Sequence, residues 1–201
     1  EYDDAESAFH YYLMAVERGD FQSAYNVATC YGRGYGVDED LGKAFENYML
    51  AAEAAHAKAQ FQIGNFYFEG RGNVVQDYAK AVVWLNKAYH NMDEEDSWQP
   101  AAELAVCYQN GWGTFQDDDI AFRFLSEIEE NGVLEEVWEP LDAMVLNALG
   151  VAYGFGRGTE QNISQAIEYF DLAIEYDSED AKRNRACFKK TIFGKWKMVK
   201  E

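Results

Sequence analysis

The chain has 201 residues, 48% of them hydrophobic, which is enough to bury a substantial core. Its 36 acidic and 17 basic residues give a net charge of −19, which argues against nucleic acid as a partner because a binder needs clustered cations. No stretch approaches the roughly 18 apolar residues of a membrane-spanning helix. The N-terminus lacks the charged-then-apolar pattern of a signal peptide. The compartment stays open: cytoplasmic, or exported (periplasmic or luminal) with a signal removed.

The first 19 residues predict one amphipathic helix, because their apolar side chains recur at helical spacing. The pattern matches the second helix of the repeats that follow. We therefore expect residues 1–19 to form a half repeat whose preceding part has been removed. The residues concerned are Ala8, Tyr11, Tyr12, Ala15 and Val16.

A tyrosine, two glycines and an alanine then recur four times. The glycines follow the tyrosine by three and five residues, and the alanine follows it by 13 or 14. Such a period indicates a solenoid, in which each unit buries its apolar face against its neighbours. The copies are Tyr31-Gly34-Gly36-Ala44, Tyr67-Gly70-Gly72-Ala81, Tyr108-Gly111-Gly113-Ala121 and Tyr153-Gly156-Gly158-Ala166.

Each copy predicts a helix, a tight turn and a second helix. A small residue three positions before each tyrosine lets a neighbouring helix approach closely. The glycines permit the positive φ angles that end the first helix, and a capping residue lies four positions before each alanine. The small residues are Ala28, Gly64, Ala105 and Gly150, and the capping residues are Asp40, Asp77, Asp117 and Asn162.

Two insertions lengthen the later periods, and both contain a Trp-x-Pro tripeptide: Trp98-Gln99-Pro100 and Trp138-Glu139-Pro140. Proline favours the first position of a helix, and the preceding tryptophan could form a hydrophobic staple. Exposed tryptophans would instead be interface residues. Trp112, in the turn of the third copy, is a further candidate for exposure.

The C-terminal segment differs in charge from the rest of the chain. Residues 182–201 contain eight basic residues and one acidic residue, a net charge of +7, whereas residues 1–181 carry a net charge of −26. The spacing of its apolar residues predicts an amphipathic capping helix over residues 180–201 with a basic outer face. The charge serves either self-neutralisation or docking to an acidic surface or anionic lipid. The apolar residues are Phe188, Ile192, Trp196 and Val199.

The repeated motif resembles the Sel1-like repeat family, which is related to the tetratricopeptide repeats. Lys43-Ala44 and Lys80-Ala81 reproduce the Lys-Ala pair of that family, whereas Ile120-Ala121 and Gln165-Ala166 keep only the alanine. The resemblance implies an all-α fold, a right-handed α-solenoid whose first helices line a concave surface that holds proteins together rather than catalysing. We expect a single domain over residues 1–201. Its parts are the half repeat 1–19, repeats at about 20–56, 57–92, 99–131 and 141–177, and the capping helix 180–201.

Motifs for catalysis, metals or cofactors are missing from the sequence. No phosphate loop, nucleophile elbow or zinc-ligand spacing occurs, so we expect no enzyme activity, no metal and no cofactor. Three cysteines do not make a disulfide framework. Cys30 and Cys107 each precede a repeat tyrosine, which is typical of a small buried hydrophobe.

The predicted function is a non-enzymatic protein–protein interaction module, a scaffold or adaptor, whose acidic exterior favours a partner with a basic surface. An immunity-type protein that neutralises a secreted bacterial toxin is the alternative, and a hydrolase is a third. The oligomeric state stays open. If the first helices line the groove, aromatic and amide side chains point into it, although some of these aromatics could instead pack against the next repeat. The predicted partner-binding residues are Tyr25, Thr29, Phe61, Asn65, Phe68, Glu69, Gln109, Asn110, Asn147 and Phe155, with Trp98 and Trp138 in the insertions.

Overall fold

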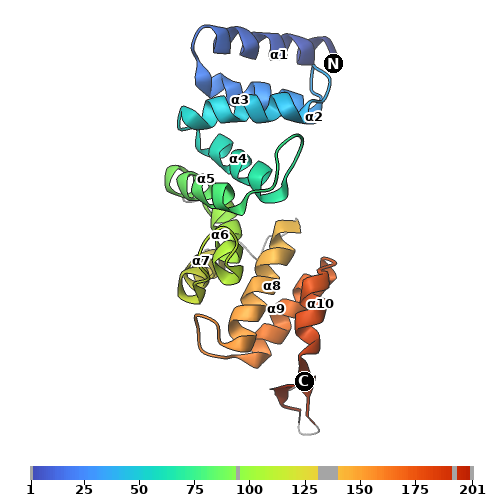
Figure 1. The fold of residues 1–201 in the computed structure, drawn as a ribbon. Helices are drawn as coiled ribbons and strands as arrows, with labels where there is room; N and C mark the ends of the chain where they lie inside the picture. Colours follow the sequence, from blue (N-terminus) through green and yellow to red (C-terminus); the bar gives the residue numbers. More distant parts are fainter. Residues whose placement is uncertain (1, 94–95, 131–139, 192–193, 200–201) are drawn as a thin grey trace. The chain divides into compact units, whose positions relative to one another are not determined.

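The structure, a computed structural model, describes residues 2–93, 96–130, 140–191 and 194–199. Within these ranges the regular secondary structure is helical apart from one short hairpin near the chain's end, which confirms the predicted all-α class (Figure 1). The chain divides into two compact units, residues 1–100 and 101–201. Each unit is described by itself, and a single domain over the whole chain stays a prediction.

Unit 1 consists of successive helices that pack on their neighbours in sequence. Its core contains the small residues Ala28 and Ala44 together with Tyr48, Ile63 and Phe66, all buried. The elements are α1 (Tyr2–Glu17), the short 3₁₀ helix η1 (Phe21–Ser23), α2 (Ala24–Arg33), α3 (Leu41–Glu53), α4 (Ala57–Glu69) and α5 (Tyr78–Asn91). Helix α6 (Trp98–Asn110) begins at the unit boundary.

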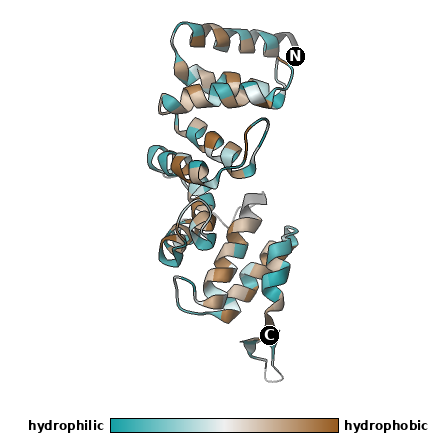
Figure 2. Ribbon diagram, in the orientation of Figure 1, coloured by the Kyte–Doolittle hydropathy of each residue, from teal (hydrophilic) through white to brown (hydrophobic). Residues whose placement is uncertain are grey.

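Unit 2 continues the helical pattern and ends in the hairpin. Helices α8 and α9 pack closely together, and their core includes Leu146, Phe170 and Phe188. Figure 2 shows α10 as largely hydrophilic. After α6, the elements are α7 (Asp118–Glu130), α8 (Pro140–Phe155), α9 (Ile163–Glu175), α10 (Glu179–Ala186), β1 (Phe188–Lys190) and β2 (Trp196–Met198).

The turn inside each repeat has the predicted construction. Gly34 ends α2 with a φ of 64°, in the left-handed region that favours glycine. The Asp40 carboxylate then accepts a hydrogen bond from the Lys43 N–H at 3.0 Å and so caps α3. The other three capping residues make the same contact with the amides of Lys80, Ile120 and Gln165.

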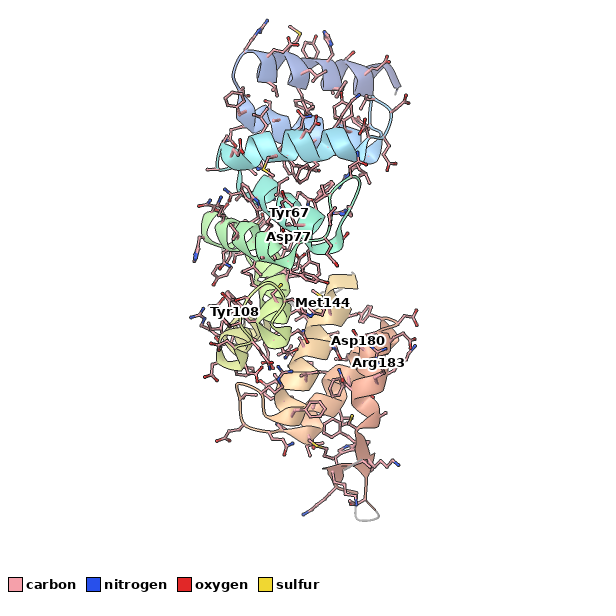
Figure 3. All side chains as sticks on the ribbon, viewed as in Figure 1. Tyr67, Asp77, Tyr108, Met144, Asp180 and Arg183 are labelled. Carbon is pink, nitrogen blue, oxygen red and sulfur yellow. The ribbon has the colours of Figure 1, made fainter. Side chains whose placement is uncertain are left out.

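The capping residue also ties the turn back to the tyrosine. In the second copy the Asp77 N–H donates to the Tyr67 carbonyl oxygen at 2.8 Å, and both residues are labelled in Figure 3. The same bond recurs in the other copies at 2.8–2.9 Å. One residue therefore satisfies a carbonyl near the end of the first helix and an amide at the start of the second.

A hydrogen-bonded cluster joins three helices of unit 2. The Glu129 carboxylate on α7 accepts hydrogen bonds from Tyr153 (2.8 Å) on α8 and from Tyr169 and Gln165 (3.1 Å) on α9. Burial, followed by donation to Glu129, raises the pKa of Tyr153 to about 12. The same causes raise the pKa of Tyr169. Neither the cluster nor its partners were predicted from the sequence.

The predicted capping helix over residues 180–201 is wrong beyond its first turns. Helix α10 ends at Ala186, and the chain then forms an antiparallel hairpin in which Phe188 pairs with Met198 and Lys190 with Trp196. Gly194, at a φ of 79°, lies in the connection between the strands. Ile192 lies outside the described residues.

Candidate functional site

A groove of about 700 Å³ lies in unit 2, between α6, α8 and α10. Met144 on α8 and Asp180 and Arg183 on α10 are among its lining residues and are labelled in Figure 3. Its volume is within the range of ligand-binding clefts. Apolar, amide and charged side chains all contribute to its walls.

Four of the predicted binding residues line the groove. Gln109 and Asn110 come from α6, and Asn147 and Phe155 come from α8. Trp112, which is 38% exposed as predicted, lies in the turn that follows α6. The aromatic and aliphatic side chains therefore share one surface with primary amides, as is common in peptide-binding sites.

Two hydrogen-bonded side chains hold one wall of the groove in place. The buried Gln109 amide donates to the Ala148 carbonyl at 3.0 Å and so links α6 to α8. The Arg157 guanidinium donates to the Gln109 carbonyl and also pairs with Asp118 at 2.7 Å. The hydrogen bond from Arg157 holds the pKa of Asp118 below its ordinary value. Arg157 thus holds the end of α6 at the groove, and the Asp118 carboxylate balances its charge.

The asparagines of the groove keep part of their hydrogen-bonding capacity. Asn184 on α10 donates through Nδ2 to Asn147 Oδ1 at 2.9 Å, and Asn110 donates to the Val106 carbonyl. In the described ranges, Asn147 Nδ2 and Asn184 Oδ1 have no further protein partner. One donor and one acceptor therefore stand ready for a peptide group of a bound chain.

The sequence alone did not identify the α10 wall. Asp180, Arg183 and Asn184 line the groove, and Arg183 pairs with Asp180. The sequence predicts a capping helix over residues 180–201 and gives no sign that its first turns line a groove. Asn147 and Asn184 share no repeat position, so the spacing of the motif carried no signal for their contact.

The predicted residues on α2 in unit 1 mostly pack internally. Tyr25 stacks on the His56 ring with centroids 4.5 Å apart and also contacts Tyr48. The Thr29 hydroxyl donates to the Tyr25 carbonyl at 2.9 Å. Both Tyr25 and Thr29 are half-buried, and their contribution to partner binding stays a prediction.

The predicted residues on α4 differ widely in exposure. Phe61 is buried at 7% exposure, whereas Asn65 and Phe68 are half-buried, and Phe68 packs edge-on against Tyr78. Glu69 is exposed and pairs with Arg71 at 2.9 Å. Phe61 therefore behaves as a core residue, which is the alternative left open for the aromatics.

Of the two insertion tryptophans, the structure places one. Trp98 is half-buried and begins α6, so Pro100 is the third residue of that helix rather than the first. The described part of α8 starts at Pro140, and Trp138 lies outside the described residues, so a helix start at this proline stays a prediction.

A second and larger hollow occurs in unit 1, beside α1 and the turn after α2. It measures about 1210 Å³, and Phe9, His10 and Met14 are among its lining residues. The predicted binding residues do not line it.

The potential metal ligands and the cysteines are the groups that bear on enzymatic chemistry. Within them, His, Cys, Asp and Glu side chains form no group of three that could hold a metal ion. Cys30 and Cys107 are buried, as predicted, and burial raises the pKa of Cys107 to about 12. A thiol with so high a pKa is a poor nucleophile at neutral pH. Among the described helices, none has the length and apolarity to cross a membrane.

The profile of the Sel1 repeat family matches five segments, residues 2–20, 22–56, 57–91, 101–133 and 143–175. The chain belongs to the Sel1 repeat family. The predicted resemblance is thereby confirmed, and the first matched segment covers the N-terminal helix.

Curated relatives of this Sel1 repeat chain include regulatory and binding proteins. Over 170 residues it is 32% identical to chitin synthase regulatory factor 2 of Schizosaccharomyces pombe, covering 85% of this chain and 30% of the relative. It is 26% identical over 186 residues to DAP3-binding cell death enhancer 1 of Mus musculus, covering 92% of this chain and 34% of the relative. The chain thus spans about a third of the length of these relatives.

Solved structures agree with the fold. A Sel1 repeat protein from Oxalobacter formigenes superposes with a TM-score of 0.68 at 24% identity, covering 90% of this chain and 67% of that one. A protective antigen of uropathogenic Escherichia coli with an SLR fold gives a TM-score of 0.65 at 26% identity, covering 90% and 36%. These similarities confirm the predicted repeat solenoid.

Proposed function

We propose that the chain is a non-catalytic adaptor that holds a short segment of a partner protein in the groove between α6, α8 and α10. The observation that supports it best is the composition of this groove. Met144, Val151 and Phe155 offer apolar contacts beside the amides of Asn147 and Asn184. Such a surface suits a peptide that inserts apolar side chains while its backbone bonds to the asparagines.

The relatives support a role in regulation through binding. One is named as a regulatory factor of chitin synthase and another as a binder of DAP3. Each name describes its own protein: one names regulation of chitin synthase and the other names binding to DAP3, and a binding role in regulation is what we propose for this chain. None of the relatives named above is described as an immunity protein, so that alternative finds no support. A hydrolase finds no support in the described residues either.

Site-directed photocrosslinking tests the proposal. The crosslinker p-benzoylphenylalanine replaces Asn110, which is exposed at the groove, or Leu172, which is 43% exposed on α9 and does not line it. Both proteins are irradiated in an extract of the source cells. We expect a protein to be crosslinked from Asn110 and not from Leu172. Equal crosslinking from both positions would argue against the groove.

The captured partner then allows a measurement of affinity. Met144→Glu places a charge in the groove, and Leu172→Glu places the same charge outside it. If Met144 contacts the partner, the Met144→Glu variant should bind it about tenfold or more weakly than the parent does. If both variants bind as the parent does, the groove is not the binding site. Circular dichroism verifies that each variant is folded.

A further inference from the structure

The C-terminal hairpin has one basic face. Lys189 pairs directly with Lys197 across β1 and β2, and the Thr191 N–H donates to the Lys195 carbonyl at 2.7 Å, which extends the ladder. Because side chains alternate between the two faces of a strand, Lys189, Lys195 and Lys197 share the face opposite Phe188. All three lysines are exposed.

The opposite face seats the hairpin on the core of unit 2. Phe188 is 3% exposed, and its ring lies 5.3 Å from that of Phe155 and 6.1 Å from that of Phe170. Trp196 packs against the same core, and the Arg185 guanidinium lies 4.4 Å from its ring centre. The lysine face is therefore held by buried contacts and has a defined orientation on unit 2.

These lysines differ from most of the other cations in their surroundings. Lys43, Lys80 and Arg157 each pair with a nearby aspartate, whereas Lys189, Lys195 and Lys197 form no ion pair with any described residue. Like charges directly opposite each other on two antiparallel strands destabilise the pairing. An anionic ligand would relieve this repulsion.

We infer that the lysine face of the hairpin is a docking surface for an acidic, extended segment of a partner protein. Charge complementarity carries the inference, because three lysines point the same way without carboxylate partners among the described residues. A run of aspartates and glutamates in such a segment would lie across Lys189, Lys195 and Lys197. This surface is separate from the proposed groove and does not depend on it.

The charge of the rest of the chain selects a short acidic segment over larger polyanions. Residues 1–181 carry a net charge of −26. A membrane or a duplex extends well beyond the hairpin and would bring its own charge against these carboxylates. At 0.1 M salt the Debye length is about 10 Å, so a short segment on the hairpin is largely screened from those carboxylates that lie farther away than this.

Binding of fluorescein-labelled decaglutamate, followed by fluorescence anisotropy at 50 and 200 mM NaCl, tests this inference. The variant replaces Lys189, Lys195 and Lys197 by glutamine. We expect it to bind the peptide about tenfold more weakly than the parent at 50 mM, since each exposed charge contributes a small amount. The difference should shrink at 200 mM because salt screens the interaction.

A matched control removes three lysine charges from unit 1 instead of the hairpin. Lys43→Gln, Lys58→Gln and Lys80→Gln, combined in one chain, alter the net charge equally at exposed positions of unit 1. This control should bind decaglutamate as the parent does. Equal loss in both triple variants, or no loss in the hairpin variant when circular dichroism shows it folded, would overturn the inference.

Three further measurements decide between occupants. Phosphatidylserine vesicles and a 20-nucleotide single-stranded DNA are titrated in the same way, and sedimentation velocity reports self-association. The choice of an acidic segment would be overturned if the parent bound the vesicles or the DNA more tightly than decaglutamate and the hairpin variant lost that binding. It would also be overturned if the parent self-associated and the hairpin variant did not. Weak or absent binding to both probes, with a monomeric parent, is the expected result.

Discussion

At the scale of single residues, the small side chain three positions before each repeat tyrosine determines how closely two helices approach. A Cβ atom added at Gly150 would lie 2.5 Å from Phe170 Cε1, and Phe170 is fully buried. At Gly64 the nearest atom would be Leu85 Cδ2 at 2.8 Å. The sequence predicted this close approach because a small residue recurs at a fixed offset from the tyrosine.

Gly150→Ala should therefore lower the free energy of unfolding. Overpacking against Phe170 costs about 1–3 kcal/mol, and the higher helix propensity of alanine recovers about 1 kcal/mol of this. Gly32→Ala is the matched control, because its Cβ would meet only Ala44 Cβ at an ordinary 3.7 Å. Urea unfolding should show Gly32→Ala as neutral or stabilising. A Gly150→Ala protein that is stabilised as much as Gly32→Ala would contradict the close approach.

The Glu129 cluster gives a second prediction at this scale. Glu129→Ala should cost about 2 kcal/mol at pH 8, because it removes a carboxylate that accepts from Tyr153 and Tyr169. Glu130→Ala, at an exposed neighbouring position, should stay within about 0.5 kcal/mol of the parent.

The pH dependence of this difference has a definite sign. The pKa of Tyr153 is about 12 in the folded chain against an ordinary 10.0. The protonated Tyr153 hydroxyl therefore contributes fully to the free energy of unfolding below pH 10, and this contribution is lost as the pH rises towards 12. Urea unfolding at pH 8 and pH 11 should therefore show the gap between Glu129→Ala and Glu130→Ala narrowing. A gap in the free energy of unfolding that widens at pH 11 would contradict the contribution of Glu129 to the raised pKa of Tyr153.

At the scale of elements, the repeat turn was predictable and the hairpin was not. Glycines and a capping residue act locally, so their positions in the sequence were sufficient to place the turn. In the tail, the spacings between Phe188, Trp196 and Val199 also fit a helix. The hairpin instead pairs Phe188 with Met198, a contact that depends on the core of unit 2 rather than on local spacing.

Phe188→Ala should destabilise the chain strongly for an element at its end. Phe188 is 3% exposed, and truncating a buried phenylalanine costs about 3–5 kcal/mol. Met198→Ala truncates the residue paired with it, which is 38% exposed and should cost less than about 1 kcal/mol. Chemical unfolding of the two variants measures the difference. Similar effects would mean that the hairpin is not seated through Phe188.

At the scale of the whole molecule, part of the candidate site followed from the repeat and part did not. Repeat positions placed Asn110, Asn147 and Phe155 on first helices, and the groove of unit 2 contains all three. Asn184 and Arg183 come from α10, which lies outside the repeats and has no position in their pattern. Packing of a non-repeated element on a repeat cannot be read from periodicity.

The hydrogen bond from each capping residue to its tyrosine also bears on how such chains gain or lose repeats in evolution. The second copy contains one extra residue, Asn73, yet its Asp77-to-Tyr67 bond is 2.8 Å, as short as that from Asn162 to Tyr153. Each turn is closed by residues nine or ten positions apart, so a duplicated repeat contains the residues that end its first helix and begin its second. Duplication or loss of a whole unit would leave the remaining turns intact, and selection could then act on the new side chains alone.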